Sequence, residues 1–229
     1  MSVNRRSVLK GMALTSIAGV TATGLGSALA AGPASTVTAQ PLLALVNEGP
    51  AESLFLYGAM AARDSQSQLQ VQRVDRDPGF MLEFERELRR GVPMNVIGLL
   101  DNASAALVLD MARSGGARIQ WLGQHSADAG FSRHHLLRTE IAEGCAQQLS
   151  HQLQACGAGF SVTEERQNSA VTSRQLVASS NQTSHSAQWA SSIGYLLASL
   201  GAPTTLNIPA SPNTSLPVTG SFVSFSIKA

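Results

Sequence analysis

Short apolar runs alternate with segments of helical period over most of this chain, and this alternation restricts its fold more than any other feature. The first run is LLALV at residues 42–46, and further runs follow at 68–74, 92–100, 117–123 and 159–165. A helical pattern comes after each of them. Strands that alternate with helices in this way are typical of an α/β sandwich with a mostly parallel sheet.

The connections between the strands further reduce the number of possible sheet topologies. Because crossovers between parallel strands are right-handed, few arrangements remain, and we expect a three-layer sandwich around a five-stranded, doubly wound, flavodoxin-like sheet. This α/β domain is predicted over residues 42–201, and its polar segment 166–184 fits none of the expected elements. Residues 202–229 form a tail rich in Pro, Ser and Thr. The tail ends in the alternating sequence SFVSFSIKA, which predicts an edge strand added to the sheet or to a partner.

The chain opens with two adjacent arginines followed by a long uncharged stretch. Residues 4–10 read Asn-Arg-Arg-Ser-Val-Leu-Lys. They resemble the signal of the twin-arginine (Tat) export pathway, and the matching positions are Arg5, Arg6, Leu9 and Lys10. Ala28-Leu29-Ala30 supplies the small-x-small pattern that a signal peptidase cuts. We therefore expect a signal peptide over residues 1–30, cleaved near Ala30, and a linker over residues 31–41.

This resemblance implies a location and one partner. The Tat translocase carries proteins that have already folded in the cytoplasm, so we expect a folded periplasmic protein. The alternative is a membrane anchor, because residues 11–29 approach the length of a bilayer span. Gly and Thr make that segment only weakly apolar, and no Cys lies at the cleavage site to carry a lipid. We therefore expect no stable membrane anchor.

Charge and composition exclude several classes of function. The formal net charge is +1, and three of the 16 basic residues lie in the leader. Elsewhere Lys and Arg form no cluster and aromatic residues are sparse, so nucleic-acid binding is not expected. Lys228 is the only lysine outside the leader. A lysine nucleophile or Schiff base is therefore excluded from the body of the domain.

The sequence also lacks the motifs that mark common cofactors and nucleophiles. It contains no G-x-x-x-x-G-K-[ST], no G-x-G-x-x-G after a strand and no C-x-x-C-H, so nucleoside triphosphate, dinucleotide and covalent haem are not expected. After the first strand, NEGPAES lacks the hydroxyl-rich loop that holds FMN in flavodoxins. No G-x-S-x-G or H-E-x-x-H motif is present either. The sequence identifies no cofactor.

The two cysteines, Cys145 and Cys156, lie in one segment that predicts a helix over residues 139–156. Eleven residues along a helix separate them by about 16 Å, whereas a disulfide needs Cα atoms within about 7 Å. They share an apolar stripe with Ile141 and Leu149, which is typical of a core-facing side. We therefore expect two free, buried thiols.

Polar residues follow the predicted strands at their carboxyl ends, where open parallel sheets bind ligands. Glu48, Asp101 and His125 would form a rim with two carboxylates and an imidazole that titrates near neutral pH, and these are our candidate catalytic residues. Candidates for ligand binding are their neighbours Asn47, Asn102, Gln124 and Ser126. The alternative is structural, because the chain surfaces after each strand and the next helix needs a cap.

The remaining histidines give no metal site. His134 and His135 are neighbours in sequence, so on a strand or helix they point to different faces and chelate poorly. His125 and one of this pair could meet across a loop. Neither cysteine has a spacing that would add a ligand, so we predict no metal and interpret these histidines as surface or capping residues.

Two functions fit these observations. The first is an exported, non-catalytic protein, either a ligand-binding module or an accessory subunit that pairs with a partner subunit or with a second copy of the chain. The leader, the missing catalytic motifs and the sparse charge favour it. The alternative is a small hydrolase or isomerase that uses the rim of Glu48, Asp101 and His125.

Overall fold

The computed structural model describes residues 41–63, 68–74, 78–139, 141–166, 174–179, 187–200 and 218–229. The predicted signal peptide with Arg5, Arg6, Leu9 and Lys10, most of the linker and most of segments 166–184 and 202–217 lie outside these residues. Residues Thr38–Ala229 form one compact unit. None of the described helices is both long enough and apolar enough to cross a membrane.

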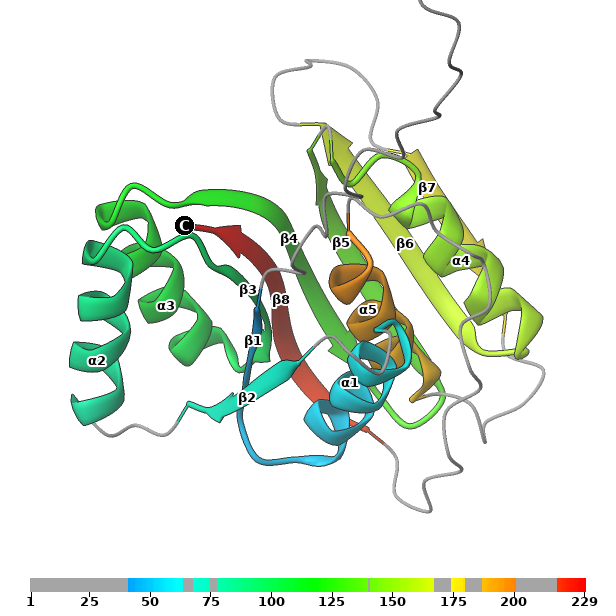
Figure 1. Ribbon diagram of the computed structural model, residues 1–229. Helices are drawn as coiled ribbons and strands as arrows, with labels where there is room; N and C mark the ends of the chain where they lie inside the picture. The colour runs from blue at the N-terminus through cyan, green and yellow to red at the C-terminus, as the bar shows by residue number, and fades with distance from the viewer. Residues whose placement is uncertain are drawn as a thin grey trace, which may run out of the picture. The chain divides into compact units, whose positions relative to one another are not determined.

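The described residues form five helices and one eight-stranded sheet (Figure 1). In chain order the elements are β1 (Leu42–Val46), α1 (Pro50–Ala61), β2 (Leu69–Arg73), α2 (Pro78–Arg89), β3 (Asn95–Leu100), α3 (Asn102–Ser114), β4 (Arg118–Ala127), β5 (Phe131–Arg138), α4 (Cys145–Ala155), β6 (Gly159–Arg166), β7 (Arg174–Ala178), α5 (Gln188–Ala198) and β8 (Gly220–Lys228). The α/β class predicted from the alternation is confirmed.

The sheet is mixed, with the strand order β2-β1-β3-β8-β4-β5-β6-β7. Strand β1 pairs in parallel with β2 and β3, and β5 pairs in parallel with β6. The other ladders are antiparallel. The prediction of a five-stranded, flavodoxin-like sheet is therefore wrong. The run at 117–123 continues as β4 to Ala127 and turns back as β5, where the sequence analysis expected no strand.

The C-terminal strand lies inside the sheet and not at its edge, so that prediction is also wrong. In Figure 1 the red β8 runs between β3 and β4, and it pairs antiparallel with both. Its alternation results from two buried faces. Val223, Phe225 and Ile227 enter one core, while Ser224 and Ser226 are buried on the other face. Serines in an alternating strand usually indicate a solvated face, and this is why the pattern favoured an edge.

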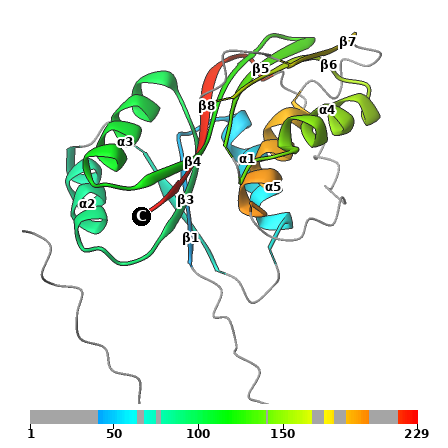
Figure 2. The same cartoon turned by 90° about the horizontal axis from the view of Figure 1, so that it is seen from above.

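Helices cover both faces of the sheet (Figure 2), and each face carries its own apolar core. On one face, α2 and α3 pack against β3 and β8 through residues such as Phe84 and Val108. On the other, α1, α4 and α5 pack through residues such as Phe55, Leu149 and Ile193. Burial of these apolar side chains from water is the main force that holds the layers together.

Helices α1 and α5 touch almost backbone to backbone, because a glycine stands at the crossing in each. A Cβ atom on Gly58 would lie 1.8 Å from the carbonyl oxygen of Ser191, and one on Gly194 would lie 1.9 Å from that of Phe55. No other residue type fits at either position without separating the helices. This close approach lets α5 bring Trp189 deep into the core.

The cysteine-bearing helix is shorter than predicted. Helix α4 begins at Cys145, because Gly144 before it has a left-handed φ of 82° that ends the helical path. Ile141 is 43 % exposed and lies outside the helix, so it does not extend the core stripe. Cys145 and Cys156 stand at the two ends of α4, where both are free thiols and only partly buried.

Both thiols should stay free and unreactive in the native protein. Burial, with a further effect of the Glu164 carboxylate, raises the pKa of Cys145 to about 11, and burial also raises the pKa of Cys156. The thiolate that reacts is therefore scarce near neutral pH. We expect an alkylating reagent to modify neither thiol until the chain is denatured, when both should react; mass spectrometry measures the labelling. A Cys145–Cys156 bridge in a non-reducing peptide map would contradict the helix between them.

Candidate functional site

The β4–β5 hairpin divides its side chains between two surfaces. Successive residues of a strand point to opposite faces, so the hairpin contributes one set of side chains to the core and another to the outside. His125 on β4 and His134 on β5 are direct cross-strand neighbours and are both buried. Gln124 and His135, the neighbouring pair, are exposed on the other face.

A chain of hydrogen bonds runs through the buried face of this hairpin. His125 Nδ1 lies 2.8 Å from His134 Nδ1, and His125 Nε2 lies 2.7 Å from the hydroxyl of Ser224 on β8. At one end Trp121 Nε1 donates to that hydroxyl at 2.8 Å. At the other end His134 Nε2 lies 2.9 Å from the hydroxyl of Ser132. Five side chains from three strands thus form one buried polar network.

One direction in this network is fixed by chemistry. An indole N–H can only donate, so Ser224 Oγ accepts from Trp121. The two rings face each other through their Nδ1 atoms, so between two neutral rings one Nδ1 donates and the other accepts. His125 and His134 therefore hold opposite tautomers, and each uses its Nε2 toward a serine hydroxyl.

Apolar packing keeps the two rings neutral. The Trp189 ring of α5 covers both, with centroids 5.2 Å from His125 and 5.5 Å from His134. Burial lowers the pKa of His134 to about 3. Burial, followed by the effect of the neighbouring His134, also lowers the pKa of His125 well below its ordinary value. The pair is therefore a neutral part of the core, and its ring nitrogens are already hydrogen-bonded within the protein.

The outer face of the same hairpin forms the floor of a groove. The groove lies between α3 and the sheet and has a volume of about 1050 Å³. Its polar lining residues are Asn102, Asp110 and Arg113 from α3 with Gln124, Ser126, Arg133, His135, Ser161, Thr163 and Ser221 from the sheet, and the buried His125 and His134 also border it. Leu107, Leu122 and Val223 add apolar surface. A concave surface of this size with convergent polar groups is the usual form of a small-molecule site.

Three of the four predicted ligand-binding residues line this groove: Asn102, Gln124 and Ser126. Register explains why residues so far apart in sequence meet. Leu100 at the end of β3 pairs with Val223, and Val223 pairs on its other side with Gln124. The start of α3 therefore lies level with the second half of β4.

The three candidate catalytic residues each have different contacts, and no described contact joins them. Glu48 is exposed and forms an ion pair with Arg73. Asp101 caps α3, since it accepts from the backbone N–H groups of Ala103 and Ser104 at 2.9 and 3.0 Å. The described contacts of His125 are with Ser224, His134 and Trp189 in the core.

Asn47, the fourth predicted ligand-binding residue, joins the ends of three strands. Its side-chain oxygen accepts from the backbone N–H of Asp101 at 2.8 Å, and its nitrogen donates to the carbonyl of Val74 at 3.0 Å. The ends of β1 and β3 thus meet at one edge, as a parallel pair should. Both polar groups of Asn47 are occupied in holding this edge together.

Arg133 was not predicted as a site residue, and the interpretation of His134 as a surface or capping residue is wrong, because its side chain is buried. A local signal for both is present. The sequence ADAGF at 127–131 has Asp and Gly where a turn needs them, and it stands between two runs of strand propensity. Read as a hairpin, it places His125 opposite His134 and brings Arg133 onto the face of Ser126.

Comparison of the chain with protein-family models, with curated proteins and with solved structures finds no match. Within the described ranges, no three His, Cys, Asp or Glu side chains lie close enough together to hold a metal ion. The polar groups that line the groove are hydroxyls, amides, two arginines, one aspartate and the histidines His125, His134 and His135.

Acid should destabilise the fold through the buried histidine pair. The unfolded chain takes up a proton on each histidine as the pH falls through about 6.5, whereas folded His134 stays neutral down to about pH 3. The neutral histidine pair therefore contributes fully to the free energy of unfolding above about pH 6.5, and this contribution is lost as the pH falls towards 3. Each histidine should change the free energy of unfolding by up to about 1.4 kcal/mol per pH unit. Urea unfolding at several pH values between about 7.5 and 4 measures it.

His134→Gln tests the assignment. It removes one titrating group, so the free energy of unfolding should depend less steeply on pH below about 6, although the variant starts from a lower stability. His151→Gln on the exposed face of α4 is the matched control and should keep the wild-type slope. If His134→Gln also keeps that slope, the pair does not titrate on unfolding.

Proposed function

We propose that this chain is an exported, periplasmic ligand-binding protein, and that the groove between α3 and the sheet binds a small polar solute. The observation that carries this proposal is the groove itself, with a volume of about 1050 Å³ and side-chain donors and acceptors from α3 and four strands. Such volumes suit molecules of the size of a metabolite. Asn102, Gln124 and Ser126 are the predicted ligand-binding residues that line it.

The surroundings of the groove support binding. On the core face of β4 and β5 the side chains are packed, whereas on the groove face Gln124, Arg133 and His135 are exposed. Leu107 of α3 is 56 % exposed at the wall of the groove. An apolar wall opposite a polar floor can bind both the carbon skeleton and the polar groups of a solute.

The described contacts do not support the predicted catalytic rim. A general base needs a ring nitrogen or a carboxylate within reach of a substrate. The ring nitrogens of His125 contact Ser224 and His134, and the Asp101 carboxylate caps α3. The groove has its own carboxylate and exposed imidazole, Asp110 and His135, and His135 is paired with Glu165. The hydrolase or isomerase hypothesis stays a prediction.

Export through the twin-arginine pathway is the second part of the proposal. Its support is the leader motif with Arg5, Arg6, Leu9 and Lys10, followed by the small-x-small pattern near Ala30. The compact unit Thr38–Ala229 begins soon after this pattern. A pathway that carries folded proteins suits a domain whose sheet needs its C-terminal strand.

Replacing both leader arginines by lysine should block export. The variant Arg5→Lys/Arg6→Lys keeps the charge but removes the residues that the translocase recognises, so the uncleaved precursor should remain in the cytoplasm. Cell fractionation and immunoblotting measure its distribution. Arg89→Lys on the exposed surface of α2 is the matched control and should be exported normally. Export of the double variant at the wild-type level would rule out the pathway.

Native mass spectrometry of the protein purified from the periplasm should reveal a bound small molecule. Ser126→Trp places a large side chain in the groove, so this variant should lose the bound mass. Val177→Trp is the control. Val177 on β7 pairs with Ser161 on β6, so it lies in the same cross-strand row and on the same face of the sheet as Ser126, but it does not line the groove. It should therefore keep the bound mass. A stoichiometric partner subunit in place of a small molecule would favour the accessory-subunit alternative.

A further inference from the structure

One cross-strand row of side chains at the hairpin end of the groove consists of hydroxyls and an arginine. Ser221 on β8 pairs with Ser126 on β4, Ser126 pairs with Arg133 on β5, and Arg133 pairs with Ser161 on β6. Directly paired residues share a face, and neighbouring strands are about 4.8 Å apart. All four residues line the groove. The row therefore presents three hydroxyls and one guanidinium on one short strip.

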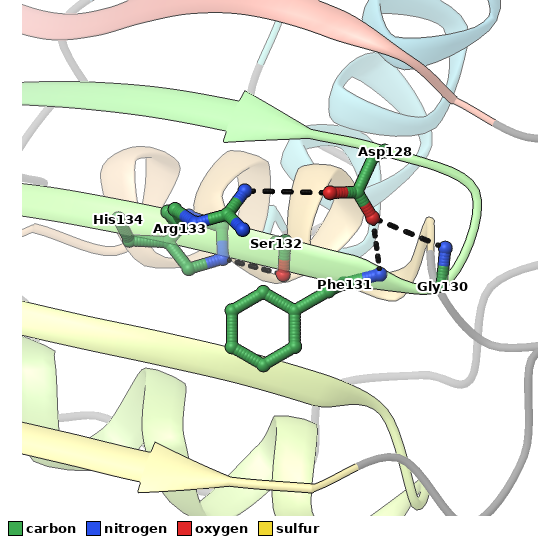
Figure 3. A network of polar contacts seen from close by, with 6 residues as sticks. All are labelled: Asp128, Gly130, Phe131, Ser132, Arg133 and His134. Atoms are coloured by element: carbon green, nitrogen blue, oxygen red, sulfur yellow. Dashed lines mark hydrogen bonds and ion pairs between the residues drawn. The ribbon is translucent and has the colours of Figure 1, made fainter.

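The turn of the hairpin holds the guanidinium of Arg133 in place (Figure 3). Its Nη1 lies 3.3 Å from the Asp128 carboxylate, and its Cζ lies 5.1 Å from the centre of the Phe131 ring. Asp128 is itself fixed, because it accepts from the backbone N–H of Phe131 at 3.0 Å and of Gly130 at 3.4 Å. Arg133 is thus held from two sides before any solute binds.

This arrangement leaves Arg133 able to bind a solute. A guanidinium has five N–H donors, and the contact with Asp128 uses Nη1 only. The side chain is 59 % exposed. Arginine donors in this fork geometry match the two oxygens of a carboxylate or phosphate. Hydroxyls on both sides can donate further hydrogen bonds to the same group.

One carboxylate stands beside Arg133 at this end of the groove, that of Asp128, which is not a lining residue. Among the described lining residues the one carboxylate is Asp110. It lies eight residues along α3 from Asn102, which is about 12 Å of helix. His135, in the next row, is paired with Glu165 at 3.1 Å, outside the lining. An anion at the hairpin end therefore meets the donors of Arg133 with Asp128 alone beside them.

We propose that the hairpin end of the groove binds the oxyanion group of the solute, a carboxylate or a phosphate, through Arg133 and the hydroxyls of Ser126, Ser161 and Ser221. This inference rests on the proposed function, since it names the chemical class of the ligand. The rest of the solute lies along α3 towards Arg113, over a distance of up to about 16 Å between the first and last turns of the helix.

The test is an NMR titration of the full ¹⁵N-labelled chain with three probes: inorganic phosphate, acetate and the neutral molecule glycerol. We expect saturable shifts of the amides of Ser126, Arg133 and Ser161 with phosphate, acetate or both, and none with glycerol. The stronger of the two anions identifies the group as phosphate or carboxylate. No saturable shift at these residues with either anion would overturn the proposal.

Substitutions tie the effect to Arg133. Arg133→Gln should weaken anion binding about tenfold or more, because it removes the charge and the fork. Arg133→Lys keeps the charge and should fall between Arg133→Gln and the wild type. Arg89→Gln on α2 makes the same charge change outside the groove and should bind like the wild type. Equal binding by Arg133→Gln and the wild type would overturn the role of this residue, provided that its thermal unfolding shows an intact fold.

Failure of this inference differs from failure of the proposed function. If the periplasmic protein carries a solute that Ser126→Trp displaces while Arg133→Gln binds it as tightly as the wild type, the groove is the site but the ligand class is wrong. If Ser126→Trp and Val177→Trp carry the same bound mass, or none is bound to the wild type, the groove is not the site of a solute.

Discussion

The two ladders of β8 hold the described sheet together. On one side β8 pairs with β3 from Asn95 to Leu100, and on the other it pairs with β4 from Arg118 to Ala127. No other described ladder joins the strands β2, β1 and β3 to the strands β4, β5, β6 and β7. The same strand supplies Ser224, whose hydroxyl accepts from Trp121 and is hydrogen-bonded to His125 Nε2. The buried polar network and the floor of the groove both depend on this one insertion.

Successive side chains of the β4–β5 hairpin point alternately into the core and into the groove. His125 and His134 fill the core between residues whose side chains form the outer surface, such as Gln124 and Arg133. A shift of one residue in either strand would bury the arginine and expose a histidine. The buried network opposes such a shift, since it would separate His125 from His134 and from Ser224. The hydrogen bonds on the core face thus help to fix the positions of the groove residues on the opposite face of the sheet.

Local periodicity was sufficient to predict the elements from β1 to the start of β4, because each apolar run and each helical stripe can be recognised within its own segment. It was not sufficient for the sheet order. Strands β3 and β4, joined by α3, read as neighbours in a parallel sheet, and nothing between them indicates that β8 separates them. The expected position at the ends of neighbouring strands placed Asn102, Gln124 and Ser126 near one another. A meeting of His125 with one of His134 and His135 was considered, and the contact with His134 is found. The contact with Ser224, from the far end of the sequence, was not foreseen.

The insertion of β8 also sets an order on events during synthesis. β3 ends at Leu100 and β8 begins at Gly220, about 120 residues later. A ribosome that adds 5–20 residues per second needs about 6 to 24 s to cover that distance. During this time β3 and β4 lack their final neighbour, and unpaired strand edges are sites where chains associate with one another. In the folded chain β8 therefore pairs with two strands that were both synthesised before it.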